Sequence, residues 1–244
     1  MKRFLTICFA IIIFHQFLFS VEHLLKEKDL FEDEKLFKQK IEEKLKFISD
    51  GNEGVFEDEN ILLEYILLKD TYLKFFEKKS EVKKKEYKKL LDEIEGRREK
   101  TKNPLLSYCL AILYGRYGEL LSIMDAVKMD IPNKIKDCAE DVIKRREEID
   151  DYGAYLILGR LYGVTPKIPF YTGWQSFEVS EYYLKKYIEK NKNSVTGKFF
   201  LAETYRAMKK TNLYDSIIED ILKNGDFETF QDKKILDSLK KSKE

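Results

Sequence analysis

Apolar positions along most of the chain recur at spacings of three, four or seven residues. This period is typical of helices that bury one face, and it differs from the strict alternation of a half-buried strand. The breaks between these segments are short and polar, so we expect consecutive helices with short connections. The expected helices cover approximately residues 30–50, 60–76, 77–102, 104–117, 132–149, 152–163, 176–190, 195–209, 212–223 and 226–240.

Two local signals sharpen this pattern. Asn103 followed by Pro104 predicts a helix start, because the Asn side chain can accept a bond from a free N–H and Pro has no N–H to satisfy. Between Val164 and Gly173 the periodicity stops. Pro166 and Pro169 both disfavour helix in the residue before them, so this segment is predicted to be a loop.

Turn-forming residues are scarce in the chain. It has 11 glycines and 4 prolines among 244 residues, too few for the many turns that a protein of short strands needs. Together with the periodicity, this predicts an all-α fold.

Opposite charges nearly cancel. The chain has 45 Lys and Arg residues against 44 Asp and Glu residues, so no overall field attracts nucleic acid or an anionic membrane. The densely charged segment 77–102 is expected to be a long helix with a solvated face. We therefore expect no nucleic-acid partner, and partner choice must depend on local surfaces.

The N-terminus has the layout of a secretory signal peptide. Basic residues at positions 2 and 3 precede an apolar run from Phe4 to Phe19, and the first acidic residue is Glu22. We predict a signal peptide over residues 1–20, cleaved after Ser20, and a periplasmic or envelope-associated mature protein beginning at Val21. The alternative is an uncleaved segment that anchors the protein in the membrane.

Chemistry-bearing residues are few after residue 20. His23 is the single remaining histidine, which excludes multi-histidine metal sites and histidine-based triads. No phosphate loop, Cys-x-x-Cys pair or nucleophile elbow occurs. Cys109 and Cys138 are either two buried thiols or a disulfide that export would permit. We expect no enzyme activity, no cofactor and no metal.

A short phrase recurs at a period typical of stacked helical pairs. It reads Leu, small residue, two residues, Tyr, and its tyrosines are 48 and 43 residues apart. A degraded copy ends at Tyr72. Leu and Tyr share a helix face, while the small residue lets a neighbouring helix approach; the alternative is a chance match. The copies are Leu110, Ala111 and Tyr114; Leu158, Gly159 and Tyr162; and Leu201, Ala202 and Tyr205.

The glycine of the central copy is predicted to lie at a close helix crossing. Gly in a helix interior costs about 1 kcal/mol relative to Ala, so Gly159 needs a compensating reason, and close packing supplies one. On this hypothesis Gly159→Leu overpacks the crossing, whereas Gly159→Ala is mild or helpful if a methyl group fits.

The segment from Tyr155 to Tyr162 resembles the first helix of a tetratricopeptide (TPR) repeat, which has an aromatic residue, Leu-Gly and Tyr at these positions. The resemblance implies antiparallel helix pairs stacked as a TPR-like α-solenoid over residues 103–244, after an N-terminal helical region at 21–102. Ser180 and Tyr187 depart from the pattern of the second helix. Residues 152–190 also resemble exported bacterial TPR-like proteins, including relatives of the T component of TRAP transporters.

The loop from Val164 to Trp174 is the candidate binding site, because it places Ile168, Phe170, Tyr171 and Trp174 between two helices of the repeat. Trp and Tyr are favoured anchors in interfaces. The alternative is that these aromatics fold back as a plug. Arg160 is a second candidate for binding a carboxylate ligand, and its alternative is a salt bridge to a neighbouring helix.

Three functions are compatible with these features. The first is an exported scaffold that binds a protein partner, as a component of a transport or envelope system; it should expose a contiguous apolar or aromatic patch on its concave side. The second is a module that binds a small apolar molecule, which needs a pocket of at least ~300 Å³. A carboxylate-dependent hydrolase is the third, and it lacks any supporting motif.

Overall fold

The structure is a computed structural model that describes residues 28–50, 58–225 and 227–241. Every regular element in these ranges is an α-helix, which confirms the all-α class. None of these helices is both long and apolar enough to cross a membrane. The predicted signal peptide, its cleavage after Ser20 and the alternative membrane anchor lie outside the described residues.

The helices follow the predicted segments closely, with the exceptions given in the next paragraph. They are α3 (Lys28–Glu32), α4 (Glu34–Asp50), α5 (Glu59–Phe75), α6 (Ser80–Thr101), α7 (Pro104–Glu119), α8 (Ile123–Lys128), α9 (Ile131–Arg146), α10 (Gly153–Val164), α11 (Phe177–Lys190), α12 (Val195–Ala207), α13 (Thr211–Asn224) and α14 (Phe230–Lys241).

Local hydrogen bonds explain the differences. The Asp33 carboxylate accepts backbone N–H groups and divides the first predicted helix into α3 and α4. The unpredicted α8 begins after Ser122, whose hydroxyl accepts the N–H of Asp125. Helix α14 begins later than predicted because Thr229 and Asp232 form a reciprocal capping box.

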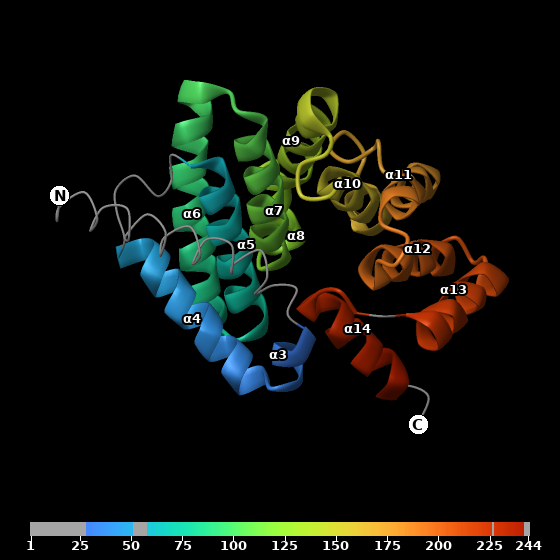
Figure 1. Cartoon of the computed structure of the whole chain (residues 1–244). Coiled ribbons are helices and arrows are strands. Elements are labelled where there is room, and N and C mark those ends of the chain that lie inside the picture. The colour runs from blue at the N-terminus through green and yellow to red at the C-terminus, as the bar shows by residue number, and fades with distance from the viewer. Residues whose placement is uncertain (1–27, 51–57, 226, 242–244) are drawn as a thin grey trace.

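Helices α5, α7, α10, α12 and α14 form an inner row in which each helix contacts the next. The intervening helices α6, α9, α11 and α13 lie outside this row and form an outer row (Figure 1). Helix α9 packs on both α7 and α10, and α11 packs on both α10 and α12. The chain therefore alternates between the two rows.

A cluster of phenylalanines joins the two ends of the described chain. Phe230 of α14 packs its ring 4.7 to 5.7 Å from the rings of Phe31, Phe37, Phe75 and Phe76. We call these five residues the phenylalanine clasp. The clasp brings the last helix of the inner row against the N-terminal helices, and α14 contacts α3 (Figure 1).

The crossing of α10 and α11 leaves no room for a side chain at Gly159. A Cβ there would lie 2.5 Å from Leu184 Cγ and 3.1 Å from the Leu184 backbone nitrogen, which confirms the predicted close crossing. Ser180 supports it by donating a 2.7 Å bond to the Gly159 carbonyl. A methyl group does not fit at this position, so the condition under which Gly159→Ala was expected to be mild is not met.

The two described cysteines are free thiols. Cys109 lies in α7 and Cys138 in α9, and both are buried. Of the two alternatives from the sequence, the structure therefore shows buried thiols and no disulfide.

Candidate functional site

The residues of the repeated phrase are structural. All those from the three copies are buried between helices, and the additional aromatic residue Tyr155 is half-buried. The buried residues are Leu110, Ala111, Tyr114, Leu158, Gly159, Tyr162, Leu201, Ala202 and Tyr205.

One part of the loop between α10 and α11 is fixed to the helices. Trp174 packs edge-on against Tyr162, with ring centroids 5.0 Å apart, and its Nε1 donates a 2.7 Å bond to Asn133 Oδ1. The buried Thr172 hydroxyl accepts the N–H of Ile168 at 2.8 Å. In this part of the loop the aromatic residue folds back, as the plug alternative proposed.

The tip of the same loop points into solvent. Phe170 is 103% exposed and Tyr171 is 53% exposed. Phe170 has a left-handed backbone with φ of 67°, a conformation that costs about 1–2 kcal/mol for a residue with a Cβ. The bonds made by Thr172 hold the backbone on both sides of the tip, so the structure fixes a loop that presents Phe170 outward.

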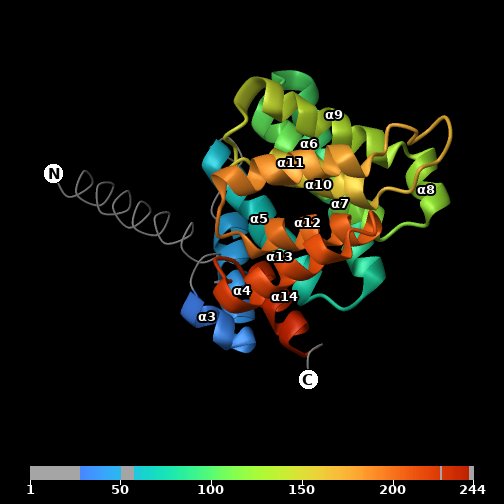
Figure 2. The same ribbon diagram turned by 90° about the vertical axis from the view of Figure 1, so that its right-hand side faces the viewer.

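Other exposed apolar side chains gather at this end of the molecule. Helix α8 and the loop lie at the same end (Figure 2), and the Trp174–Asn133 bond ties the loop to the start of α9, just after α8. Among the described residues, five of the ten large hydrophobic side chains that are exposed belong to this region. We call this set the loop-end surface: Ile123, Met124, Val164, Phe170 and Tyr171.

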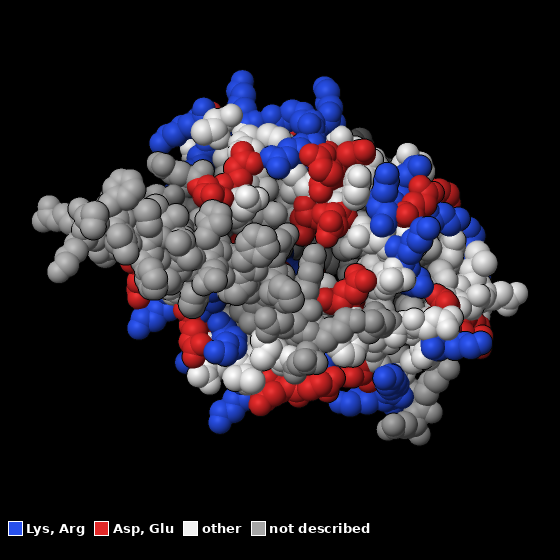
Figure 3. Space-filling model, viewed as in Figure 1, with Lys and Arg blue, Asp and Glu red and all other residues white. Residues whose placement is uncertain are grey.

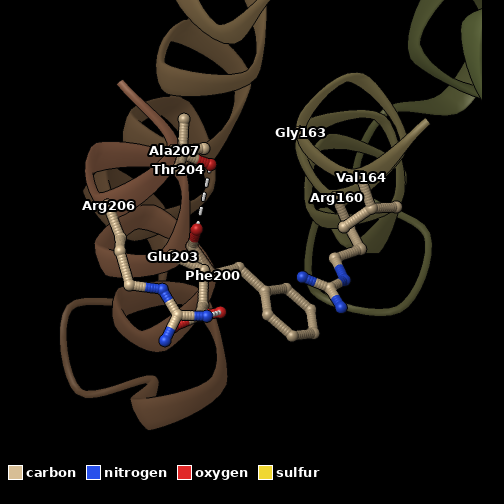
Figure 4. A pocket seen from close by; sticks show the side chains of 8 residues that line it. All are labelled: Arg160, Gly163, Val164, Phe200, Glu203, Thr204, Arg206 and Ala207. Atoms are coloured by element: carbon tan, nitrogen blue, oxygen red, sulfur yellow. Dashed lines mark hydrogen bonds and ion pairs between the residues drawn. The ribbon is translucent and has the colours of Figure 1, made fainter. Parts of the chain in front are cut away.

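Arg160 faces a pocket between α10 and α12. Its guanidinium carbon lies 4.6 Å from the centroid of the Phe200 ring, and the two side chains point toward each other in Figure 4. The salt bridge considered from the sequence is not formed, since Arg160 has no ion pair with any described residue. Burial lowers the pKa of Arg160 from its ordinary value, but an arginine remains charged.

The pocket has a volume of about 430 Å³. Arg206 and Glu203 lie on its α12 side, where they form an ion pair with each other. The remaining lining is mainly apolar, with Thr204 bonded to the backbone of its own helix (Figure 4). The lining residues are Arg160, Gly163, Val164, Phe200, Glu203, Thr204, Arg206 and Ala207.

Further charges line the inner row beside this pocket. Arg116 of α7 donates through Nε to both oxygens of Asp70 in α5, at 2.9 and 3.1 Å. The Tyr87 hydroxyl donates to the same carboxylate at 2.9 Å. Lys74 bonds to Gln231 of α14, and burial lowers the pKa of Lys74 to about 8. The inner row thus holds charged groups in addition to apolar packing.

The sequence contained a signal for these inner charges. Asp70 and Arg160 are the third residues of their copies of the phrase, and Lys74 and Arg116 are the seventh residues of theirs. The third and seventh positions are four residues apart and therefore lie on one helix face. Charges at these two positions are the signal from which a polar inner face could have been predicted, and no such face was predicted from the sequence.

The outer surface carries both charge signs. On the face shown in Figure 3, acidic and basic side chains are interspersed over the described part. Within residues 28–50, 58–225 and 227–241, no three His, Cys, Asp or Glu side chains come together as a metal site would require.

No protein-family model matches the chain. A comparison with curated protein sequences also gives no significant match.

Proposed function

We propose that this protein is a TPR-like α-solenoid that serves as a scaffold for a protein partner, without enzymatic activity of its own. The loop-end surface carries the proposal. An exposed phenylalanine on a loop fixed by Thr172 and Trp174 is pre-organised, so little side-chain and loop entropy is lost when a partner covers it.

The arrangement of helices supports the solenoid part of the proposal. The phrase copies lie on α7, α10 and α12, and the degraded copy lies on α5. All four are in the inner row, where a TPR-like array places the first helix of each pair. Unlike an open array, this one has its ends joined by the phenylalanine clasp, so the exposed loop-end surface is a better candidate for docking than the inner face.

Site-specific photo-crosslinking tests the docking proposal. A photoreactive residue at Phe170 should crosslink to one defined protein in cells that naturally produce this chain. The same residue at Leu213, an exposed apolar position on α13, is the matched control. Phe170→Ser should reduce copurification of that protein without changing the helix content. Equal crosslinking from both positions, or none from Phe170, would contradict the proposal.

We further propose that the scaffold acts in the periplasm or the envelope, in a transport or envelope system. The support is the N-terminal layout and the resemblance of residues 152–190 to relatives of the TRAP T component. Intact mass from an envelope fraction tests the first part. A mature protein that begins at Val21 is the expected result, and a chain that retains residues 1–20 would instead indicate a membrane anchor.

The pocket favours a second candidate function, the binding of a small molecule. Its volume of about 430 Å³ exceeds the ~300 Å³ at which ligand pockets begin. Its lining combines apolar groups with charge, so a purely apolar ligand fits it less well than an amphipathic one.

A further inference from the structure

Arg160 differs from the other arginines of the described chain. Each of the other six forms an ion pair with a carboxylate. Arg160 forms neither an ion pair nor a hydrogen bond with a described residue, and its guanidinium instead faces the Phe200 ring. The paired arginines are Arg97, Arg98, Arg116, Arg145, Arg146 and Arg206.

The carboxylates near Arg160 are already held by other cations. Glu203 is paired with Arg206, and Glu119 lies 3.5 Å from Arg116. Both carboxylates act on Arg160 electrostatically, but neither is within ion-pair distance of it. The positive charge of Arg160 is therefore left without an ion-pair partner among the described residues.

The Arg160 guanidinium is arranged to bind a planar anion. Its cation–π contact with the Phe200 ring holds the group in place, and its N–H donors are free to form two parallel bonds to a carboxylate. A dianion such as a phosphate monoester fits less well, because Glu203 and Glu119 would repel the second negative charge.

The rest of the pocket suits an apolar group. Val164, Ala207 and the Phe200 ring also line the pocket, so a ligand that bonds to Arg160 would place its body against carbon atoms. We infer that this pocket binds a carboxylate carried on a small apolar or aromatic group. This inference deepens the small-molecule function proposed above. The pocket and the loop-end surface share Val164, whereas Phe170 belongs to the surface alone.

Calorimetry on the whole protein tests the inference. Hydrocinnamate is the probe, and its uncharged amide is the matched control ligand. The carboxylate should bind about tenfold or more tightly than the amide, as expected for loss of a charge-assisted pair. Equal affinities for hydrocinnamate and its amide would overturn the inference. So would the absence of binding at millimolar concentration for both hydrocinnamate and the peptide Ala-Ala-Ala-Ala-Phe with a free C-terminus.

Two arginine variants separate a direct bond from general charge. Arg160→Gln should weaken hydrocinnamate binding about tenfold or more, and Arg160→Lys should restore part of it. Arg146→Gln removes an arginine charge that lies outside the pocket and is paired with Glu59, so it should have a much smaller effect. Equal losses for the two Gln variants at unchanged melting temperatures would overturn the direct bond.

A peptide comparison identifies the source of the carboxylate. The peptide Ala-Ala-Ala-Ala-Phe is tested with a free C-terminus and with an amidated one. Tighter binding of the free peptide than of hydrocinnamate indicates the end of a protein chain, whereas binding of hydrocinnamate alone indicates a small acid. Phe170→Ser should leave both affinities unchanged, so failure of the docking proposal and failure of this inference are distinguishable.

Discussion

The phenylalanine clasp and the charged inner row are neighbours in the fold, yet they are built from opposite chemistry. The clasp packs five apolar rings. Three of them, Phe31, Phe37 and Phe230, are buried, and fully burying such a ring contributes about 1.5–3 kcal/mol. The inner row buries Asp70 against Arg116, where desolvation offsets much of the attraction. The comparison indicates that the clasp supplies the stability of closure, while the charged row contributes mainly geometry and polarity.

The largest expected effect is in the clasp. Phe230→Ala should lower the free energy of unfolding by about 3–5 kcal/mol, because it removes a buried ring and leaves a cavity. Urea denaturation measures this loss. Leu213→Ala, at an exposed position on α13, should stay within about 0.5 kcal/mol of the unaltered protein. A loss below about 1 kcal/mol for the Phe230 variant would show that the clasp is dispensable.

A smaller loss is expected in the charged row. Asp70→Asn should destabilise by about 2–3 kcal/mol, somewhat less than for a fully buried pair, because Arg116 retains 27% side-chain exposure. Adding Arg116→Met should recover part of the loss, since no unpaired charge then remains. If the double variant is less stable than the single variant, the pair contributes more than geometry.

The α10–α11 crossing at Gly159 allows the effect of close packing to be measured without a change in an aromatic ring or a charge. Gly159→Ala should destabilise by about 1–3 kcal/mol through overpacking, and Gly159→Leu should destabilise more. Gly115→Ala in α7 is the matched control, because no atom lies within 4 Å of its added Cβ. It should stabilise by about 0.5–1 kcal/mol through helix propensity. Melting temperatures of the three variants decide whether the crossing is as tight as described.

The last expected effect is a pH dependence at Lys74. Burial, followed by the charge of Arg116, lowers its folded-state pKa from 10.5 to about 8, although Asp70 and Glu119 oppose the shift. From about pH 8 to about 10.5 the unfolded chain then binds more protons, so the free energy of unfolding rises with pH. Lys74→Met should lack this rise in urea denaturation at several pH values. Parallel pH profiles for the two proteins would contradict the shift.

The sequence predicted the helices well where local chemistry determines them. The Asn103 side chain accepts the N–H of Leu105 at 2.9 Å, as the Asn-Pro signal indicated. Helix α8 was missed because six residues are too few to display a helical period. The α14 boundary depends on Asp232, which also accepts the N–H of Thr196 in α12, and such a distant contact leaves no local pattern.

The candidate site was predicted less completely. Composition identified Phe170 and Trp174, but their opposite directions depend on bonds to Thr172 and Asn133. Arg160 was identified from the phrase, whereas its lack of a salt bridge depends on the spacing of α10 and α12. Its cation–π partner Phe200 was not identified, because the phrase gives no indication of which residues face each other across two helices.

The labelling rates of the buried thiols Cys109 and Cys138 can report how often the paired helices α7 and α9 open. Burial raises the pKa of Cys109 to about 12 and that of Cys138 to about 11, so almost no thiolate forms near neutral pH. A thiol reagent can then label either residue only when its helix opens. Matching labelling rates would mean that the inner and outer helices open as one unit, and different rates would reveal which row loosens first.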